Sequence, residues 1–75
     1  SYKEIHHYII AGAFAEKKNA NRMLAKLNNL NYPAEILKEG QLLKVSYESF
    51  NNREDAVLAL NKIRRVNPSA WLLTK

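Results

Sequence analysis

The 75-residue sequence contains no cysteine and only two glycines and two prolines. Without cysteine it can form neither a disulfide framework nor a thiolate metal site, and the redox compartment stays undetermined. Its uncharged runs, such as the one between Glu4 and Glu16, are far shorter than the ~20 apolar residues of a transmembrane helix. No signal-peptide pattern is present. Because the chain begins at Ser1 rather than Met, we expect it to be a domain of a longer protein.

Acidic residues are fewer than basic ones, with seven Asp and Glu against twelve Lys and Arg, which gives a net charge of +5. This balance favours an anionic partner, either nucleic acid, anionic lipid or an acidic polymer, without choosing among them. The hydrophobic fraction of 47% and the charged fraction of 25% are typical of a globular protein. A chain of this length allows one small domain, and we expect it to span residues 1–75.

The sequence contains an internal repeat. Residues 8–37 align without a gap on residues 44–73, at a constant shift of 36 positions. Identical residues in the alignment include the pairs Phe14/Phe50, Ala20/Ala56, Lys26/Lys62, Asn31/Asn67, Ala34/Ala70 and Leu37/Leu73. Hydrophobic character also matches between the remaining core-type positions. We therefore interpret the domain as an internal duplication.

Each repeat unit has the pattern of a strand, a helix and a second strand. Residues 5–13 and 42–49 are rich in β-branched and aromatic residues, and residues 34–37 and 70–74 are shorter strands of the same kind. Two apolar stripes at helical spacing lie between them: Ala20, Leu24, Leu27 and Leu30 in the first unit, and Ala56, Leu60, Ile63 and Val66 in the second. Asn52 is the expected N-cap of the second helix, whereas the first helix has no capping residue at Ala15. Gly40 is expected to adopt positive φ in a hairpin between the units.

This order predicts an α+β domain of β-α-β-β-α-β, ferredoxin/RNP-like topology. The right-handed crossover rule gives a four-stranded antiparallel sheet with two helices on one face and the first strand of each unit in the centre. Side chains alternate along a strand, so one set faces the helices: Ile9, Ala11, Ala34, Ile36, Val45, Tyr47, Ala70 and Leu72. The other set lies on the uncovered face: Tyr8, Ile10, Gly12, Glu35, Leu37, Lys44, Ser46, Trp71 and Leu73.

The uncovered face is the candidate functional surface. It presents an apolar and aromatic patch centred on Tyr8, Ile10, Trp71 and Leu73, with Lys44 beside it. A monomer rarely exposes such a patch without a use for it. Aromatic rings next to a cation suit planar or pyranose-shaped ligands with anionic substituents. Alternatively, the face packs against another copy or another domain of the parent protein.

Several segments resemble the SPOR (sporulation-related repeat) domain family of bacterial cell-envelope proteins. Tyr8-Ile9-Ile10-Ala11-Gly12-Ala13-Phe14 is similar to the family's opening strand, which ends in Gly-Ser-Phe. Asn19-Ala20 and Asn31-Tyr32-Pro33-Ala34 resemble its N-A…G-Y-x-A pattern. Lys44-Val45-Ser46-Tyr47-Glu48-Ser49-Phe50 is similar to its third strand, and Arg53-Glu54-Asp55-Ala56 to the start of its second helix. The resemblance covers residues 5–74.

The resemblance implies a non-catalytic domain that binds peptidoglycan glycan strands lacking stem peptides, in the periplasm or cell envelope at the division septum. It implies no cofactor, and contact with a membrane only through an anchor of the parent protein; we expect a monomer. Together the resemblance and the strand pattern place glycan contacts at Tyr8, Ile10, Ala13, Leu42, Lys44, Ser46, Trp71 and Leu73. Glu48 stands where the family has glycine, and it would oppose an anionic ligand if it shared that face.

Three other functions compete with peptidoglycan binding. An RRM-like domain that binds single-stranded RNA has the same topology, but the third strand lacks the glycine and the paired aromatics of the RNA-binding motif, so no nucleic acid is expected. A ligand-sensing regulatory domain of ferredoxin-like shape would need a side-by-side dimer and an effector pocket, and no sequence feature indicates either. An enzyme is not expected either, because the adjacent residues His6 and His7 would point to opposite faces of a strand and could not share a metal.

Overall fold

The computed structural model describes residues 4–75, so the first three residues of the expected domain lie outside it. The elements follow in the order β1 (His7–Phe14), α1 (Lys17–Asn29), β2 (Glu35–Glu39), β3 (Leu42–Phe50), α2 (Arg53–Ile63) and β4 (Trp71–Thr74). They form one antiparallel sheet of four strands in the order β2-β3-β1-β4. The predicted α+β topology, with β1 and β3 at the centre, is therefore confirmed.

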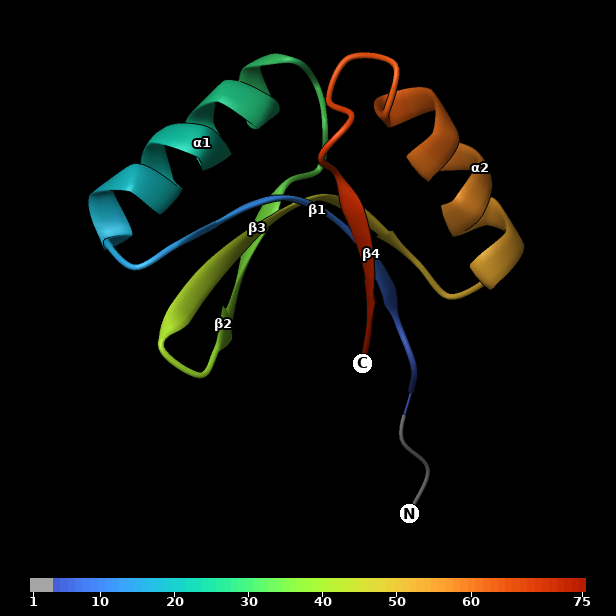
Figure 1. Ribbon diagram of the computed structural model, residues 1–75, viewed down its shortest axis with the longest axis horizontal. Helices are drawn as coiled ribbons and strands as arrows, with labels where there is room; N and C mark the ends of the chain where they lie inside the picture. The colour runs from blue at the N-terminus through green and yellow to red at the C-terminus, as the bar shows by residue number, and fades with distance from the viewer. Residues whose placement is uncertain (1–3) are drawn as a thin grey trace.

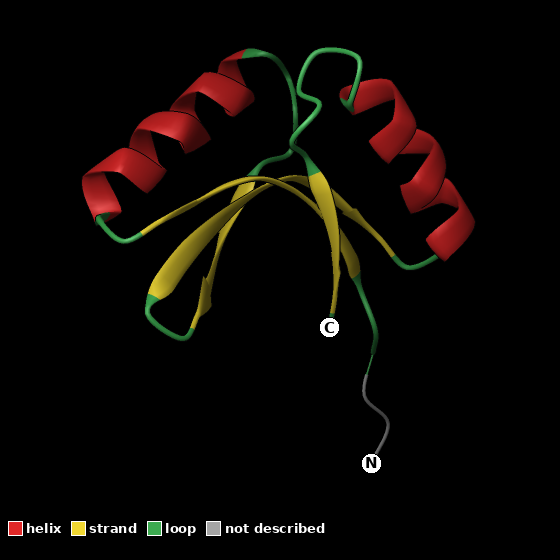
Figure 2. Ribbon diagram, viewed as in Figure 1, coloured by secondary structure: helices red, strands yellow, loops and turns green. Residues whose placement is uncertain are grey.

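Both helices lie on the same side of the sheet (Figure 1). The sheet is arched, with its convex side toward the helices and its concave side away from them (Figure 2). Within residues 4–75, no helix or strand covers the concave side. No helix in this part of the chain is both long enough and apolar enough to cross a membrane.

The core lies between the sheet and the helices. All eight residues expected to face the helices belong to it: Ile9, Ala11, Ala34, Ile36, Val45, Tyr47, Ala70 and Leu72. Ala20, Leu27, Leu60 and Ile63 cover them from the two helices, and Phe14 and Phe50 pack at the strand ends. Ala56 of the second helix is also fully buried. The first three positions of each helical stripe are thus buried or half-buried, as the spacing predicts.

Two positions of those stripes are not buried. Leu30 and Val66 are 59% and 77% exposed, because α1 and α2 end before reaching them. After α1 the chain turns at Asn31 with φ of 70°, and the amides of Asn31 and Tyr32 donate to the carbonyls of Asn28 and Leu27. This is the Schellman pattern of helix termination. The expectation that Leu30 and Val66 continue the core was wrong.

The two helices begin differently. The Asn52 side chain accepts hydrogen bonds from the backbone amides of Glu54 at 2.7 Å and Asp55 at 3.3 Å, as expected of the N-cap. Glu16 occupies the same place before α1, and its side chain caps no backbone amide. Gly40 has φ of 62° in the two-residue loop between β2 and β3, as the hairpin prediction requires.

The pairing of β1 with β3 shifts register twice near the middle of the sheet. Tyr8 pairs with Ser49, Ile10 with Ser46, and Gly12 with Val45. Two residues of β3, Tyr47 and Glu48, therefore oppose Ile9, and two residues of β1, Ala11 and Gly12, oppose Val45. Such bulges bend a strand and increase its twist, which accounts for the arch of the sheet.

The bulges also relate the two units to each other. Ala11 and Gly12 become Tyr47 and Glu48 when the 36-residue shift is applied, and the first residues of α1 and α2, Lys17 and Arg53, differ by the same shift. The internal duplication stays a prediction that this geometry supports.

Candidate functional site on the uncovered sheet face

Cross-strand pairing identifies the side chains on the concave face, because directly paired residues point to the same side of a sheet. Starting from Tyr8, the register places the predicted site residues together: Tyr8 with Leu73, Ile10 with Trp71 and with Ser46, Ala13 with Lys44, and Leu42 with Glu39. All eight residues that the sequence indicated lie on this face. Whether they bind a glycan stays a prediction.

Trp71, Tyr8 and Leu73 form the apolar part of this face. They lie on the neighbouring strands β1 and β4, and each is half-buried, so part of each side chain remains open to a ligand. Trp71 is absent from the core beneath the helices. An indole and a phenol on a concave surface can stack on the apolar faces of sugar rings.

Ile10 and Ser46 lie on this face but are 0% exposed. They pair with each other at the centre of the two middle strands, and Trp71 and Glu35 flank them in the same row of the sheet. The Ser46 hydroxyl donates to the Glu48 carbonyl oxygen at 3.0 Å, so it is satisfied within the protein. The expectation that Ile10 contributes exposed apolar surface was wrong, since Ile10 and Ser46 form the floor beneath the residues that a ligand could touch.

The bulge in β1 places Gly12 on the helix side, contrary to expectation, and Ala13 on the uncovered face. Gly12 was expected on the uncovered face, but a Cβ built on it would lie 3.2 Å from the Phe14 ring and 3.9 Å from the Met23 methyl group, on the helix side. The bulge places both Ala11 and Gly12 on that side, and Ala13 then returns to the uncovered face opposite Lys44. Simple alternation from Ile9 would have placed Ala13 beneath the helices.

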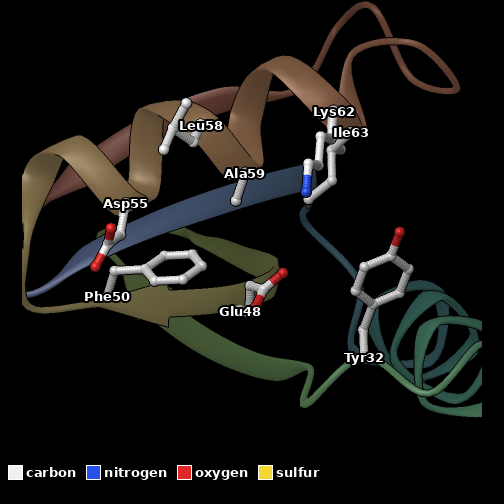
Figure 3. Close-up of a pocket in the computed structure, with 8 residues that line it drawn as sticks. All are labelled: Tyr32, Glu48, Phe50, Asp55, Leu58, Ala59, Lys62 and Ile63. Atoms are coloured by element: carbon white, nitrogen blue, oxygen red, sulfur yellow. The ribbon is translucent and has the colours of Figure 1, made fainter.

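Glu48 does not share the uncovered face. Together with Phe50 it lines a cleft against α2 on the helix side of the sheet, as Figure 3 shows. The bulge at Tyr47 and Glu48 is the reason, because it turns both side chains toward the helices. The negative charge of Glu48 is therefore directed away from a ligand on the concave face.

Lys44 is the cation on the candidate surface, and it is already paired. Its ammonium group donates to the Glu39 carboxylate, and the Lys44 side chain is only 18% exposed. This hydrogen bond, together with the positive charge of Lys44, lowers the pKa of Glu39 below its ordinary value. This pair was not predicted from the sequence. The hairpin could have indicated it, because the hairpin register places Glu39 opposite Leu42 and diagonal to Lys44 on one face.

The two histidines make separate contacts. His6 Nε2 lies 3.1 Å from a Glu4 carboxylate oxygen, and His7 Nδ1 lies 2.8 Å from the Thr74 hydroxyl. Residues 4–75 contain no group of three or more potential metal-ligating His, Cys, Asp or Glu side chains. Tyr47, which the RNA-binding motif would need on the uncovered face, is 6% exposed and packs in the core.

Fold and surface together define a small RNP-like α+β domain whose accessible sheet face is concave and lined with aromatic residues. The SPOR domain family model matches residues 3–74, and the chain belongs to this family. Its structure is similar to the solution structure of the peptidoglycan binding domain of the B. subtilis cell wall lytic enzyme CwlC. The TM-score is 0.75 and the identity 18%, covering 100% of this chain and 95% of that one. No curated protein sequence matches the chain.

Proposed function

We propose that the domain binds peptidoglycan through the uncovered sheet face, recognises glycan strands that lack stem peptides, and thereby brings its parent protein to the division septum in the cell envelope. The observation that carries the proposal is the half-buried pair of rings, Trp71 and Tyr8, on the concave face of a SPOR-family domain. The domain acts as a monomeric, non-catalytic module without a cofactor, and an anchor elsewhere in the parent protein supplies any contact with a membrane.

The shape and lining of the face support a linear sugar polymer. A concave sheet can seat a rod-shaped chain across its strands, and the rings of Trp71 and Tyr8 offer flat apolar surfaces to the sugars. Because Lys44 is paired with Glu39, this face has little free positive charge, and stacking and shape contribute more to binding than ion pairing does. Ala13 and Leu42 lie exposed toward one end of the face, where they can extend the apolar contact.

The same shape favours strands without stem peptides. A peptide on each muramic acid would project from the glycan and would have to be accommodated between the sugar backbone and the raised edges of the arch. Discrimination of this kind arises from clashes with the wrong ligand as much as from contacts with the right one. We therefore expect amidase treatment of peptidoglycan to increase binding.

The test is a pull-down of the domain with purified sacculi, with and without amidase treatment. Trp71→Ala should weaken binding to treated sacculi by about tenfold or more, since truncation of a central aromatic anchor commonly has an effect of this size. The control is Leu58→Ala, which truncates an apolar side chain that is 63% exposed on the helix side, and it should bind as the wild type does.

Tyr8→Ala serves as a second variant in case Trp71→Ala fails to fold, and a one-dimensional proton NMR spectrum establishes folding of each. Undiminished binding by folded Trp71→Ala and Tyr8→Ala domains would refute the proposed site. Equal binding to treated and untreated sacculi would refute the preference for peptide-free strands. A homopolymer RNA, assayed at equal salt, should not bind.

A further inference from the structure

Two hollows lie side by side along α1, on the helix side of the sheet. One, of about 270 Å³, is lined by Phe14, Asn19, Arg22, Met23 and Lys26. The other, of about 390 Å³, lies between the ends of the two helices and shares Met23 and Lys26 with the first. We call the two together the α1 groove. The residues that matter below are Phe14, Arg22, Met23, Lys26, Leu30 and Val66.

The groove carries exposed apolar side chains where the helical stripes predicted buried ones. Leu30 and Val66 line the second hollow and are 59% and 77% exposed. Phe14 and Met23, which are half-buried, give the first hollow an apolar wall. Exposed aliphatic side chains that line a concavity are typical of a surface that another molecule covers. Met23 adds a flexible thioether, which adapts readily to varied apolar groups.

The groove is also positively charged. Arg22 and Lys26 are one helical turn apart, and α1 contains no acidic residue from Lys17 to Asn29. Ion pairs in residues 4–75 occur between His6 and Glu4 and between Lys44 and Glu39, so neither Arg22 nor Lys26 is neutralised by a carboxylate of the described chain. A ligand of complementary charge would carry two or more carboxylates beside its apolar groups.

The fold itself does not require this charge. The equivalent cleft of the second unit, shown in Figure 3, is lined by Phe50, Leu58, Ala59 and Lys62 at the positions of Phe14, Arg22, Met23 and Lys26. It replaces the arginine with leucine and adds the carboxylates of Glu48 and Asp55. Two clefts in equivalent places thus have opposite character, and only the α1 groove has two cations with an apolar wall.

We propose that the α1 groove docks an acidic, apolar peptide segment of a partner protein. Apolar side chains of the peptide fill the two hollows on either side of Met23, and its carboxylates pair with Arg22 and Lys26. A sugar would leave most of its hydroxyl groups unpaired against Phe14, Met23, Leu30 and Val66. A flat bilayer does not enter a concavity. An apolar peptide side chain enters the hollow and leaves no polar group unpaired there. Peptide recognition by a groove beside a helix needs only a few such anchors.

Two residues that each occur once in the chain can report separately on the two surfaces. Met23 is the only methionine of the chain and lines both hollows, whereas Trp71 is the only tryptophan and lies on the opposite, uncovered face. The probe is the capped peptide Glu-Leu-Glu-Glu-Phe-Glu-Glu-Leu, titrated into the 13C-methyl-methionine domain. We expect the Met23 methyl resonance to shift saturably while the Trp71 fluorescence stays constant. Denuded glycan should change the Trp71 fluorescence and leave the Met23 methyl resonance unshifted. Failure of the peptide site and failure of the glycan site can therefore be told apart.

The variant Arg22→Ala/Lys26→Ala should lower the peptide affinity tenfold or more. The control Lys62→Ala/Arg65→Ala has the same net charge and carries one of its changes at the position equivalent to Lys26, and it should stay within twofold of the wild type. Equal weakening by the two double variants would overturn the proposal, since it would show charge attraction without a groove. An unshifted Met23 resonance, or equal binding of a peptide with Gln in place of every Glu, would overturn it as well. A homopolymer RNA that shifts Met23 more strongly than the peptide would assign the groove to nucleic acid instead.

Discussion

The contact between Lys44 and Glu39 sets how much positive charge the uncovered face can offer to a glycan carboxylate. Because Glu39 holds the ammonium group, Glu39→Gln should release Lys44 and strengthen binding to peptide-free glycan fragments by about three- to tenfold. Lys44→Met should have the opposite effect or none. The change in Trp71 fluorescence on titration with the fragments measures the affinity of each variant.

Glu48→Gln is the matched control for this prediction. It makes the same chemical change on β3 but lies on the helix side of the sheet, so it alters the net charge equally without freeing Lys44. The affinity of Glu48→Gln should stay close to that of the wild type. If both Gln variants bind more tightly to the same degree, the overall charge is responsible and the local release of Lys44 is not.

Individual residues of the site could be assigned to a face from the sequence, but their exposure could not. Alternation placed Tyr8, Trp71 and Leu73 correctly on the uncovered side. It could not show that Ile10 and Ser46 would be fully buried there, because that depends on the curvature of the sheet and on the size of their cross-strand neighbours. The Lys44–Glu39 pair was within reach of sequence reasoning, since the hairpin register fixes their diagonal positions.

At the scale of elements, the starts of the two helices offer a symmetric experiment. Glu16 and Asn52 have nearly the same backbone conformation, with φ, ψ of −105°, 133° and −100°, 123°, but only Asn52 caps its helix. Asn52→Ala should lower the free energy of unfolding by about 1 kcal/mol, and Glu16→Asn should raise it by up to about 1 kcal/mol. Urea denaturation measures both changes.

Asn51→Ala is the control, because Asn51 is exposed and precedes the cap without bonding to the helix. It should alter the unfolding free energy by no more than about 0.5 kcal/mol. A loss of stability in Glu16→Asn would show that the existing contact from the Asn19 amide to Glu16, at 3.2 Å, is worth more than a cap.

The identity and order of the elements followed from the sequence, since the repeat, the apolar stripes and the turn residues all agreed on one topology. The bulges did not. An extra residue in a strand leaves the pattern of strand residues almost unchanged, yet it reverses which face the following side chains occupy. This is why Gly12 was assigned to the wrong face, while the corresponding bulge in β3 turned Glu48 away from the site.

For the whole molecule, the distribution of charge matters more than its total. The +5 net charge favours an anionic partner, but the uncovered face carries Glu35 and Glu39 beside Lys44. The cations gather instead on the helices, where Lys17, Lys18, Arg22 and Lys26 follow one another along α1. The domain therefore has one face suited to stacking on neutral sugar rings and another suited to acidic partners.

This separation predicts how salt affects glycan binding. Charges distant from the contact surface steer the ligand toward the protein but do not hold it once bound, so they act on the association rate. Raising the salt from about 50 to 500 mM should slow association severalfold, because the Debye length falls from about 14 Å to about 4 Å and the distant charges are screened, and should leave dissociation nearly unchanged. Stopped-flow measurement of Trp71 fluorescence gives both rates.

Lys18→Gln/Arg65→Gln should reproduce part of the salt effect, and Lys18→Arg/Arg65→Lys, which keeps the charge, should not. Dissociation that accelerates with salt as much as association slows would show instead that the bound glycan is held by ion pairs on the sheet face.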